Sequence, residues 1–321
     1  MTRPKIRDGI YPTMLTPYTQ RGEVDEKALR SLTEWYEKKG CQGIFAACQS
    51  SEIFFLSLEE RRRITEITAQ EAASIAAESG REKMTVVASG HVSDDPGEQA
   101  EELTAMWESG ADVAVLISNR LDIEKKGEKQ WIEELEALLR RLPGEIPLGI
   151  YECPTPYKRL ISEKMLKEIR DTGRFCFFKD TCCDPELLTK RLKLLEGSSL
   201  KLFNANAQTL LYTLQGGGAG YCGIMANFHP ELYIWLKENW MREKERADRL
   251  ENILSMAAFS EVLPYPATAK YYLKEYEGLP MNAFSRSCRQ RELKAYDRLV
   301  MGQLERLSGD IKCRLMKGEE S

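Results

Sequence analysis

Short apolar runs rich in β-branched and aromatic residues recur along the first 230 residues, and charged segments separate them. These runs cover residues 9–13, 43–47, 84–90, 113–118, 146–152, 175–180, 200–204 and 220–225. Several of them are continuously apolar rather than alternating, which is typical of strands buried on both faces of a parallel sheet. The pattern therefore predicts eight buried strands.

The segments between the runs carry helical periodicity. In residues 25–39, for example, Leu29, Leu32, Trp35 and Tyr36 fall on one face of a helix. The same reasoning predicts helices over 25–39, 58–77, 96–109, 130–141, 162–171 and 185–195. Strands and helices therefore alternate along this part of the chain.

Eight alternating units in about 230 residues fit the length of a (β/α)8 TIM barrel. A doubly wound sheet is the alternative, but it usually has fewer strands and often a nucleotide-binding loop, and no such loop motif occurs here. We therefore predict an α/β protein of the TIM-barrel class.

Strand-like runs cease from residue 230 onward. Periodicity predicts helices over 231–259, 267–276 and 285–316. No long Gly/Ser linker separates them from the preceding units, so an independent domain is not required. We predict a barrel over 1–229 and a C-terminal helical extension over 230–321, packed on the barrel.

Composition excludes several classes of function. The chain of 321 residues has a net charge of −4 with both signs interspersed, which does not indicate nucleic-acid binding. No apolar run reaches membrane-spanning length. The nine cysteines lie mostly in apolar runs and no signal peptide precedes them, so we expect reduced thiols and a cytoplasmic location. The two histidines, His91 and His229, show no zinc spacing, and no metal is expected.

The stretch FCFFKDTCC places Lys179 at the end of the sixth predicted strand, behind Phe177 and Phe178. The carboxyl ends of the strands carry the chemistry of a barrel of this type. An ammonium against apolar walls loses hydration, which favours the neutral amine that attacks a ketone to form a Schiff base. The alternative is a strand-end lysine that extends to water or pairs with Asp180.

Tyr151 ends the neighbouring fifth predicted strand, in the stretch GIYECPTPYKR. A phenol beside an imine can relay protons to and from the reacting atoms. Pro154 and Pro156 stiffen the loop that follows. The alternative is a half-buried tyrosine with no chemical role.

These motifs together resemble the dihydrodipicolinate synthase / N-acetylneuraminate lyase family of class I aldolases, from about residue 9 to 227. The resemblance rests on GIYPTMLTPYTQRGEVDEKAL, GCQGIFAACQSSEIFFLSLEER, IYECP, FFKDT and GGGAGYCGIMANFHPEL. It implies a (β/α)8 barrel in which Lys179 forms the imine and Tyr151 relays protons. It also implies a lyase acting on pyruvate or a sugar-derived keto acid, and a homotetramer or homodimer. The imine itself is the electron sink, so no cofactor is expected.

The resemblance also implies which residues bind the substrate. The two hydroxyl residues that hold the keto acid's carboxylate in the family fall on Gln49 and Ser50, and Ser51 replaces a glycine. An ordinary serine-rich loop is the alternative. Glu52 matches the motif's acid and is expected to brace the loop.

Two further residues are candidates for contact with the substrate. Asn204 ends the seventh predicted strand, where the family often contacts the variable part of its substrate. Cys222, in the eighth run, is included although it is expected to pack inside the barrel.

The chain departs from the synthase branch at two places. The first is the tyrosine that follows the fourth strand in that branch. Arg120 or Leu121 replaces it here, so no phenol completes the proton relay. The second is an arginine, whose position is taken by Pro156. A genuine dihydrodipicolinate synthase is therefore not expected. The alternatives are a sugar-acid dehydratase that uses the same imine and a degenerate barrel that binds or senses a ligand. The sequence leaves open the substrate, the direction of reaction and the roles of Arg120, His91 and His229.

Overall fold

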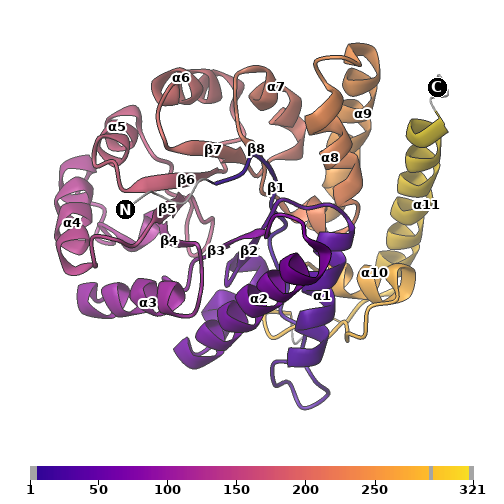
Figure 1. Cartoon of the computed structure of the whole chain (residues 1–321), viewed down its shortest axis with the longest axis horizontal. Coiled ribbons are helices and arrows are strands. Elements are labelled where there is room, and N and C mark those ends of the chain that lie inside the picture. Colours follow the sequence, from indigo (N-terminus) through magenta and orange to yellow (C-terminus); the bar gives the residue numbers. More distant parts are fainter. Residues whose placement is uncertain (1–5, 289–291, 318–321) are drawn as a thin grey trace.

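The computed structural model describes residues 6–288 and 292–317, in which eight parallel strands form a nearly closed barrel (Figure 1). The strands are β1 Gly9–Ile10, β2 Gly43–Ala46, β3 Thr85–Ala88, β4 Val113–Ile117, β5 Leu148–Tyr151, β6 Phe175–Asp180, β7 Lys201–Asn204 and β8 Gly220–Tyr221. Neighbours pair in sequence order and β8 returns to β1, while a bridge between Thr13 and Phe45 joins the β1 and β2 segments. The predicted (β/α)8 TIM barrel is confirmed.

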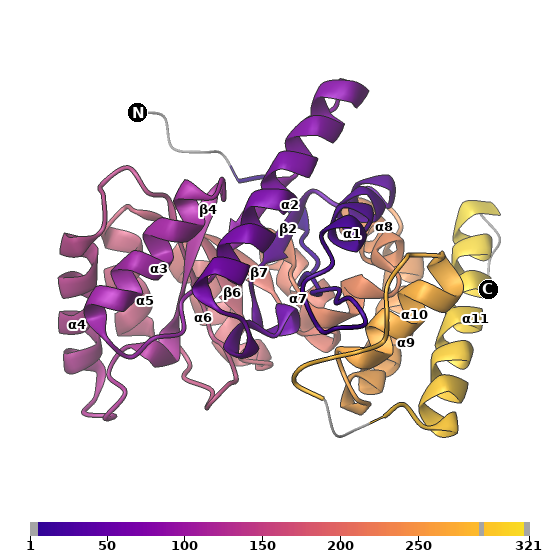
Figure 2. The ribbon, with the colours of Figure 1, turned by 90° about the horizontal axis from the view of Figure 1, so that it is seen from below.

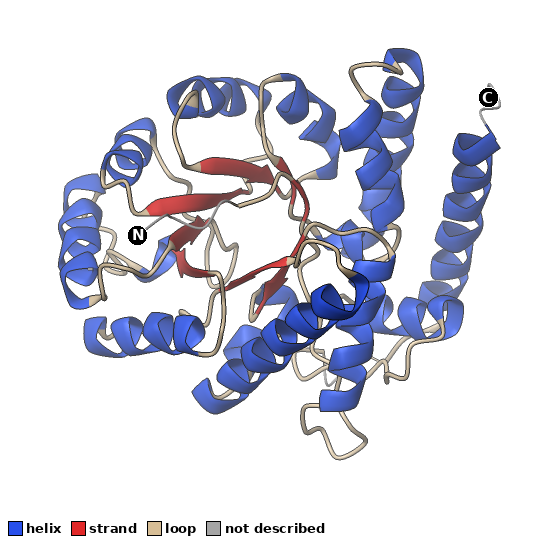
Figure 3. Cartoon of the chain, viewed as in Figure 1, coloured by secondary structure: helices blue, strands red, loops and turns tan. Residues whose placement is uncertain are grey.

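A ring of helices surrounds the strands (Figure 3). Its members are α1 Glu26–Lys38, α2 Leu58–Ser79, α3 Pro96–Glu108, α4 Glu128–Arg141, α5 Glu163–Asp171, α6 Pro185–Leu195, α7 Leu210–Gln215 and α8 Pro230–Asn239. Side-chain caps fix several starts, and Ser57 forms a capping box with Glu60. The sequence pattern missed α7, because six residues are too few to show a helical period. In the described part of the chain, no helix has the length and apolar composition needed to cross a bilayer.

Aromatic rings fill the interior of the barrel below its carboxyl end. Phe177 stacks on Phe203 with 4.8 Å between ring centroids, and Tyr11 meets Phe203 edge-on at 4.7 Å. All three side chains are fully buried. We call Tyr11, Phe177 and Phe203 the aromatic floor. The strand ends that carry Tyr151 and Lys179 lie beyond these rings.

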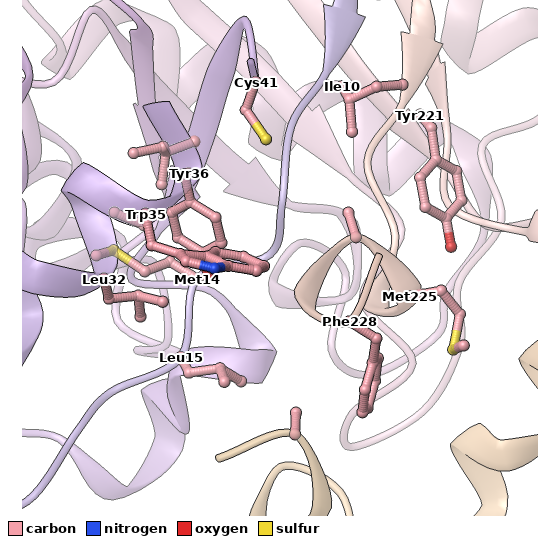
Figure 4. Close-up of a cluster of buried hydrophobic side chains, with 14 of the residues drawn as sticks. Ile10, Met14, Leu15, Leu32, Trp35, Tyr36, Cys41, Tyr221, Met225 and Phe228 are labelled. Carbon is pink, nitrogen blue, oxygen red and sulfur yellow. The ribbon is translucent and has the colours of Figure 1, made fainter. Parts of the chain in front are cut away.

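A larger apolar cluster joins the barrel to the surrounding helices (Figure 4). Leu32 and Tyr36 of α1 pack there with Ile10 of β1, and Met225 and Phe228 belong to the same cluster. The two ends of the barrel sequence are thereby held together, which compensates for the short ladders made by β1 and β8.

The helices beyond the barrel gather on one side of it (Figure 2). They are α9 Lys244–Ala257, α10 Ala267–Glu277 and α11 Ala295–Lys317, with the short 3-10 helix η6 Ala258–Val262 after α9. The continuous helix predicted over 231–259 is wrong, since α8 ends at Asn239 and α9 begins at Lys244. The division of the chain at residue 230 stays a prediction. Helix α8 begins at this residue and takes the place of the eighth barrel helix.

The helix predicted over 285–316 is also wrong at its start. The last helix begins at Ala295, and the chain before it runs back toward the barrel, where Ser285 and Ser287 bind Glu52. Residues 289–291 lie outside the described residues. Polar contacts with the barrel therefore override the helical pattern of the first residues of this segment.

A buried ion pair fastens the C-terminal segment to the barrel. Glu52, in the loop after β2, has a left-handed φ of 64° and accepts a hydrogen bond from Lys270 Nζ of α10 at 2.7 Å. The same carboxylate accepts from Ser285 Oγ at 2.8 Å and from the Ser287 backbone N–H at 2.7 Å. The prediction that Glu52 braces its loop is extended here to a role in holding residues 285–287.

Replacing Lys270 by methionine is expected to lower the free energy of unfolding at pH 7 by about 3–5 kcal/mol, because the Glu52 carboxylate would stay buried without its cation. Burial lowers the pKa of Lys270 to about 8, so the side chain still carries most of its charge at pH 7. Urea unfolding measures the change. The matched control, Lys274→Met, changes an exposed lysine one turn later on α10 and should stay within about 0.5 kcal/mol of the original protein. Equal losses for both variants would contradict the ion pair's importance.

Candidate active site

A cavity of about 480 Å³ opens at the carboxyl ends of the strands. Its walls include loop residues that follow β2, β5, β6, β7 and β8, together with residues of the C-terminal segment between 261 and 288. A larger surface hollow of about 720 Å³ is lined by Asp8, Lys201 and Ala219, near the amino ends of β7 and β8 and away from Lys179. The first cavity is therefore the candidate active site, as the position of the chemistry in TIM barrels leads one to expect.

Lys179 and Tyr151 lie side by side in this cavity. Strands β5 and β6 pair in a register that sets Tyr151 opposite Lys179. The Lys179 Nζ atom is 4.3 Å from the centroid of the Tyr151 ring and 5.2 Å from that of Phe45, and the residue is only 4% exposed. The two side chains that the sequence singles out therefore meet at one point of the pocket.

The alternative ion pair between Lys179 and Asp180 does not form. Asp180 is bound instead to Arg191 of α6. No Asp or Glu of the described ranges forms an ion pair with the Lys179 nitrogen. Lys179 lines the cavity, so its nitrogen is available to a ligand.

Gln49 fixes the orientation of the Tyr151 phenol. The Tyr151 hydroxyl donates to Gln49 Oε1 at 3.2 Å, and Gln49 Nε2 donates in turn to Thr155 Oγ1 at 2.8 Å. Burial raises the pKa of Tyr151 well above its ordinary value, so the hydroxyl keeps its proton at neutral pH. Gln49 lines the cavity and contacts Tyr151, while its contact with the substrate stays a prediction.

The two serines after Gln49 differ in position. Ser50 lines the cavity, and its hydroxyl donates to Thr13 Oγ1 at 2.9 Å. Ser51 is fully buried, and its hydroxyl donates to the Met14 carbonyl at 2.6 Å. The prediction that Ser51 contacts the substrate is therefore corrected: its hydroxyl holds the β2 loop against the segment after β1.

Asn204 and Cys222 also lie outside the cavity wall. The Asn204 amide nitrogen donates to Thr213 Oγ1 at 2.7 Å and to the Thr209 carbonyl at 3.1 Å, so this side chain organises the turn into α7. Its neighbour Asn206 lines the cavity instead. Cys222 is fully buried, and burial raises its pKa to about 12. The predictions that Asn204 and Cys222 contact the substrate are corrected accordingly.

Five residues of the C-terminal segment line the cavity without having been predicted: Glu261, Tyr265, Pro266, Ser287 and Cys288. The Tyr265 hydroxyl accepts a hydrogen bond from Asn227 Nδ2 at 3.1 Å, and burial raises its pKa. A second phenol therefore lines the pocket, although it does not come from the fourth strand, where no tyrosine was expected. No motif could reveal it, because it arrives from a connection between η6 and α10.

A buried guanidinium ties together the strand ends that carry Tyr151 and Lys179. Glu152 directly follows Tyr151, and Asp180 directly follows Lys179. Arg191 Nη2 donates to Glu152 Oε1 at 2.6 Å, and its Nη1 donates to Asp180. All three charged side chains are 0% exposed. We call Glu152, Asp180 and Arg191 the arginine clamp, because it links the ends of β5 and β6 to each other and to α6.

His91, His229 and Arg120 take no part in the cavity wall. His91 Nδ1 accepts from the Ile117 backbone N–H at 2.8 Å, and His229 Nδ1 lies 3.0 Å from Ser308 Oγ. Burial lowers the pKa of each histidine to about 3. Arg120 pairs with Asp94 at 2.8 Å. Within the described residues, no group of three His, Cys, Asp or Glu side chains could hold a metal ion.

Comparisons with known proteins agree with this geometry. A family model described as the dihydrodipicolinate synthetase family matches residues 7–81. The 4-hydroxy-tetrahydrodipicolinate synthase of Brucella suis is 26% identical over 271 residues, which cover 83% of this chain and 87% of the relative. The synthase of Methanothrix thermoacetophila is 22% identical over 310 residues, 95% of this chain and 99% of the relative.

Solved structures share the whole fold. A catalytic lysine mutant of the sialic acid aldolase of Ruminococcus gnavus has a TM-score of 0.83 at 19% identity, covering 98% of this chain and 99% of that one. A prophage protein of E. coli from the dihydrodipicolinic acid synthase family, in complex with pyruvate, has a TM-score of 0.77 at 20% identity, covering 95% of this chain and 98% of that one.

The fold defines the class first: a (β/α)8 TIM barrel. More particularly, residues 7–81 match the model of the dihydrodipicolinate synthetase family, and most of the chain is similar to a 4-hydroxy-tetrahydrodipicolinate synthase. The resemblance seen in its motifs is thereby confirmed.

Replacing Arg191 by methionine is expected to lower the free energy of unfolding by about 3–5 kcal/mol, because Glu152 and Asp180 would remain buried without their shared cation. Urea unfolding at pH 7 measures the loss. Lys190→Met, at the neighbouring exposed position of α6, is the control and should change stability by less than about 0.5 kcal/mol. An Arg191→Met protein as stable as this control would show that the clamp does not hold the strand ends.

Proposed function

We propose that this protein is a Schiff-base-forming lyase that acts on a 2-oxo acid, either pyruvate or a sugar-derived keto acid. The Lys179 nitrogen attacks the carbonyl carbon, the carbonyl oxygen leaves as water, and a protonated imine remains. The observation that carries this proposal is the buried Lys179, which lines the cavity beside Tyr151 without a carboxylate partner among the described residues. A lysine held in this way is a nucleophile rather than part of a structural ion pair.

The neighbouring groups suit the steps that follow. Tyr151, oriented by Gln49, relays protons at the carbon next to the imine. The Ser50 hydroxyl and the Gln49 amide are the donors proposed for the substrate's carboxylate, which requires such partners once it is buried. The imine withdraws electrons from the adjacent bond, so the chemistry requires neither a metal nor another cofactor.

The comparisons support the class of substrate. One similar structure holds pyruvate, and another is of a sialic acid aldolase whose catalytic lysine was replaced. We do not propose a genuine dihydrodipicolinate synthase, because Pro156 replaces the arginine of that branch and Arg120 is paired with Asp94. A sugar-acid dehydratase would share the same imine. A homo-oligomer stays a prediction.

Borohydride reduction in the presence of pyruvate is expected to fix a pyruvyl group on Lys179, which mass spectrometry of peptides would locate. Lys179→Arg keeps the positive charge but removes the nucleophilic amine, and it should abolish labelling. Lys158 also lines the cavity, with its nitrogen donating to the Thr181 carbonyl at 2.8 Å. Lys158→Met is therefore the matched control and should still be labelled at Lys179. If the original protein is stabilised against heat by pyruvate but forms no imine, the ligand-binding alternative holds instead.

Replacing Tyr151 by phenylalanine is expected to leave the imine intact and to slow its proton transfers. Exchange of the pyruvate methyl protons with deuterium oxide, followed by proton NMR, reports these transfers without any second substrate. The exchange rate should fall by about 100-fold or more, the usual contribution of a positioned acid–base group. An unchanged exchange rate would show that the phenol has no part in the reaction.

A further inference from the structure

Glu261 is a carboxylate in the candidate site that no motif predicted. It belongs to η6 in the C-terminal segment, and its half-buried side chain lines the same cavity as Lys179 and Tyr151. It therefore approaches the site from outside the barrel, whereas Lys179 and Tyr151 stand on barrel strands.

The two glutamates of the cavity differ in their bonding. Glu52 is committed to Lys270, Ser285 and Ser287, as described above. Glu261, by contrast, forms no hydrogen bond and no ion pair with any residue of the ranges 6–288 and 292–317. The Glu261 carboxylate is only half-buried and lines the cavity, so its oxygens are open to a ligand that enters there.

The charge that acts on Glu261 is that of Lys179, from β6, and it favours the ionised carboxylate. Other titratable groups whose pKa responds to Glu261 come from several elements around it: Cys183 after β6, Tyr221 of β8, Tyr233 of α8 and Tyr265 before α10. Burial outweighs the lysine and raises the pKa of Glu261 to about 7. Near neutral pH, both forms of the carboxyl group are therefore populated.

A relay needs a group that can hold the proton. Burial raises the pKa values of the Tyr151 and Tyr265 phenols, so neither can keep a negative charge at neutral pH. Gln49, which accepts the Tyr151 hydrogen bond, cannot take up a proton as an amide. A carboxylate that titrates near the working pH is the efficient base for such a site.

We propose that Glu261 is the acid–base residue of this pocket, the group that takes the proton from the carbon next to the imine and later returns it. The inference rests on the proposed imine at Lys179. In the forward step the bond between this carbon and its hydrogen breaks. The proton passes by way of Tyr151 to the Glu261 carboxylate. The electron pair of the broken bond forms the carbon–carbon double bond of an enamine. The imine's carbon–nitrogen double bond becomes single and its nitrogen neutral. The reverse step restores the imine and the carboxylate.

The test uses the full chain with pyruvate as the probe. Borohydride labelling of Lys179 and exchange of the pyruvate methyl protons are both measured between pH 5 and 9. In the original protein the exchange rate should rise with pH through about 7, because the base form of Glu261 is the ionised one. Glu261→Gln should be labelled at Lys179 like the original protein, but its exchange should fall by about 100-fold or more and should lose this rise. Tyr151→Phe should exchange slowly and keep the rise.

Glu251 on α9 supplies the matched control. Burial raises its pKa to about 7 as well, yet it lies outside the cavity and accepts a hydrogen bond from the Leu211 backbone N–H at 3.2 Å. Glu251→Gln should therefore keep both the exchange rate and its rise with pH. Glu261→Asp retains a carboxylate and should show the rise at a reduced rate, which separates an acid–base role from a role in folding.

Several results would overturn the inference. The first is a Glu261→Gln protein whose exchange rate and pH dependence equal those of the original protein. The second is a Glu251→Gln protein whose exchange rate no longer rises with pH. The third is a Glu261→Gln protein that is folded but not labelled at Lys179, because Glu261 would then act before the imine forms. Failure of the original protein to be labelled is a different outcome, since it removes the proposed imine itself.

Discussion

The arrangement of the site depends on one buried guanidinium. Arg191 lies between Glu152 and Asp180, and each of these acids directly follows a residue of the proposed reaction. Taking three charges out of water is costly unless they satisfy one another, so the arrangement is stable in only one geometry. That geometry holds the ends of β5 and β6 at a fixed spacing, and the register of the two strands then sets Tyr151 against Lys179. A helix on the outside of the barrel thus determines the position of groups on its inside.

The C-terminal segment makes a contribution of a different kind. It completes the cavity with Glu261, Tyr265 and Ser287, and the pair of Glu52 with Lys270 keeps it in place. The barrel brings Lys179 and the Tyr151 phenol, while the segment brings the Tyr265 phenol and the Glu261 carboxylate. The functional unit is therefore neither the barrel nor the extension alone, even though the sequence pattern divides them near residue 230.

The fold could be predicted almost entirely from the sequence, because buried parallel strands and amphipathic helices leave strong local patterns. The strand over residues 175–180 and the helix over 185–195 coincide with β6 and α6. The site could be predicted only in part. Lys179 and Tyr151 stand at strand ends, where a motif reports their position. Asn204 and Asn206, two residues apart, could not be told apart, because the turn into α7 decides which one faces the cavity. Glu261 and Tyr265 reach the pocket through tertiary packing, which leaves no local pattern.

The aromatic floor also affects how ligands reach and leave the pocket. Tyr11, Phe177 and Phe203 fill the barrel interior below Lys179, and the cavity at the carboxyl ends of the strands gives access to this residue. The keto acid proposed as substrate would lie at the inner end of this cavity when bonded to Lys179, and a second reactant would bind between it and the solvent. The proposed imine thus implies an ordered kinetic scheme, in which the keto acid binds first and leaves last.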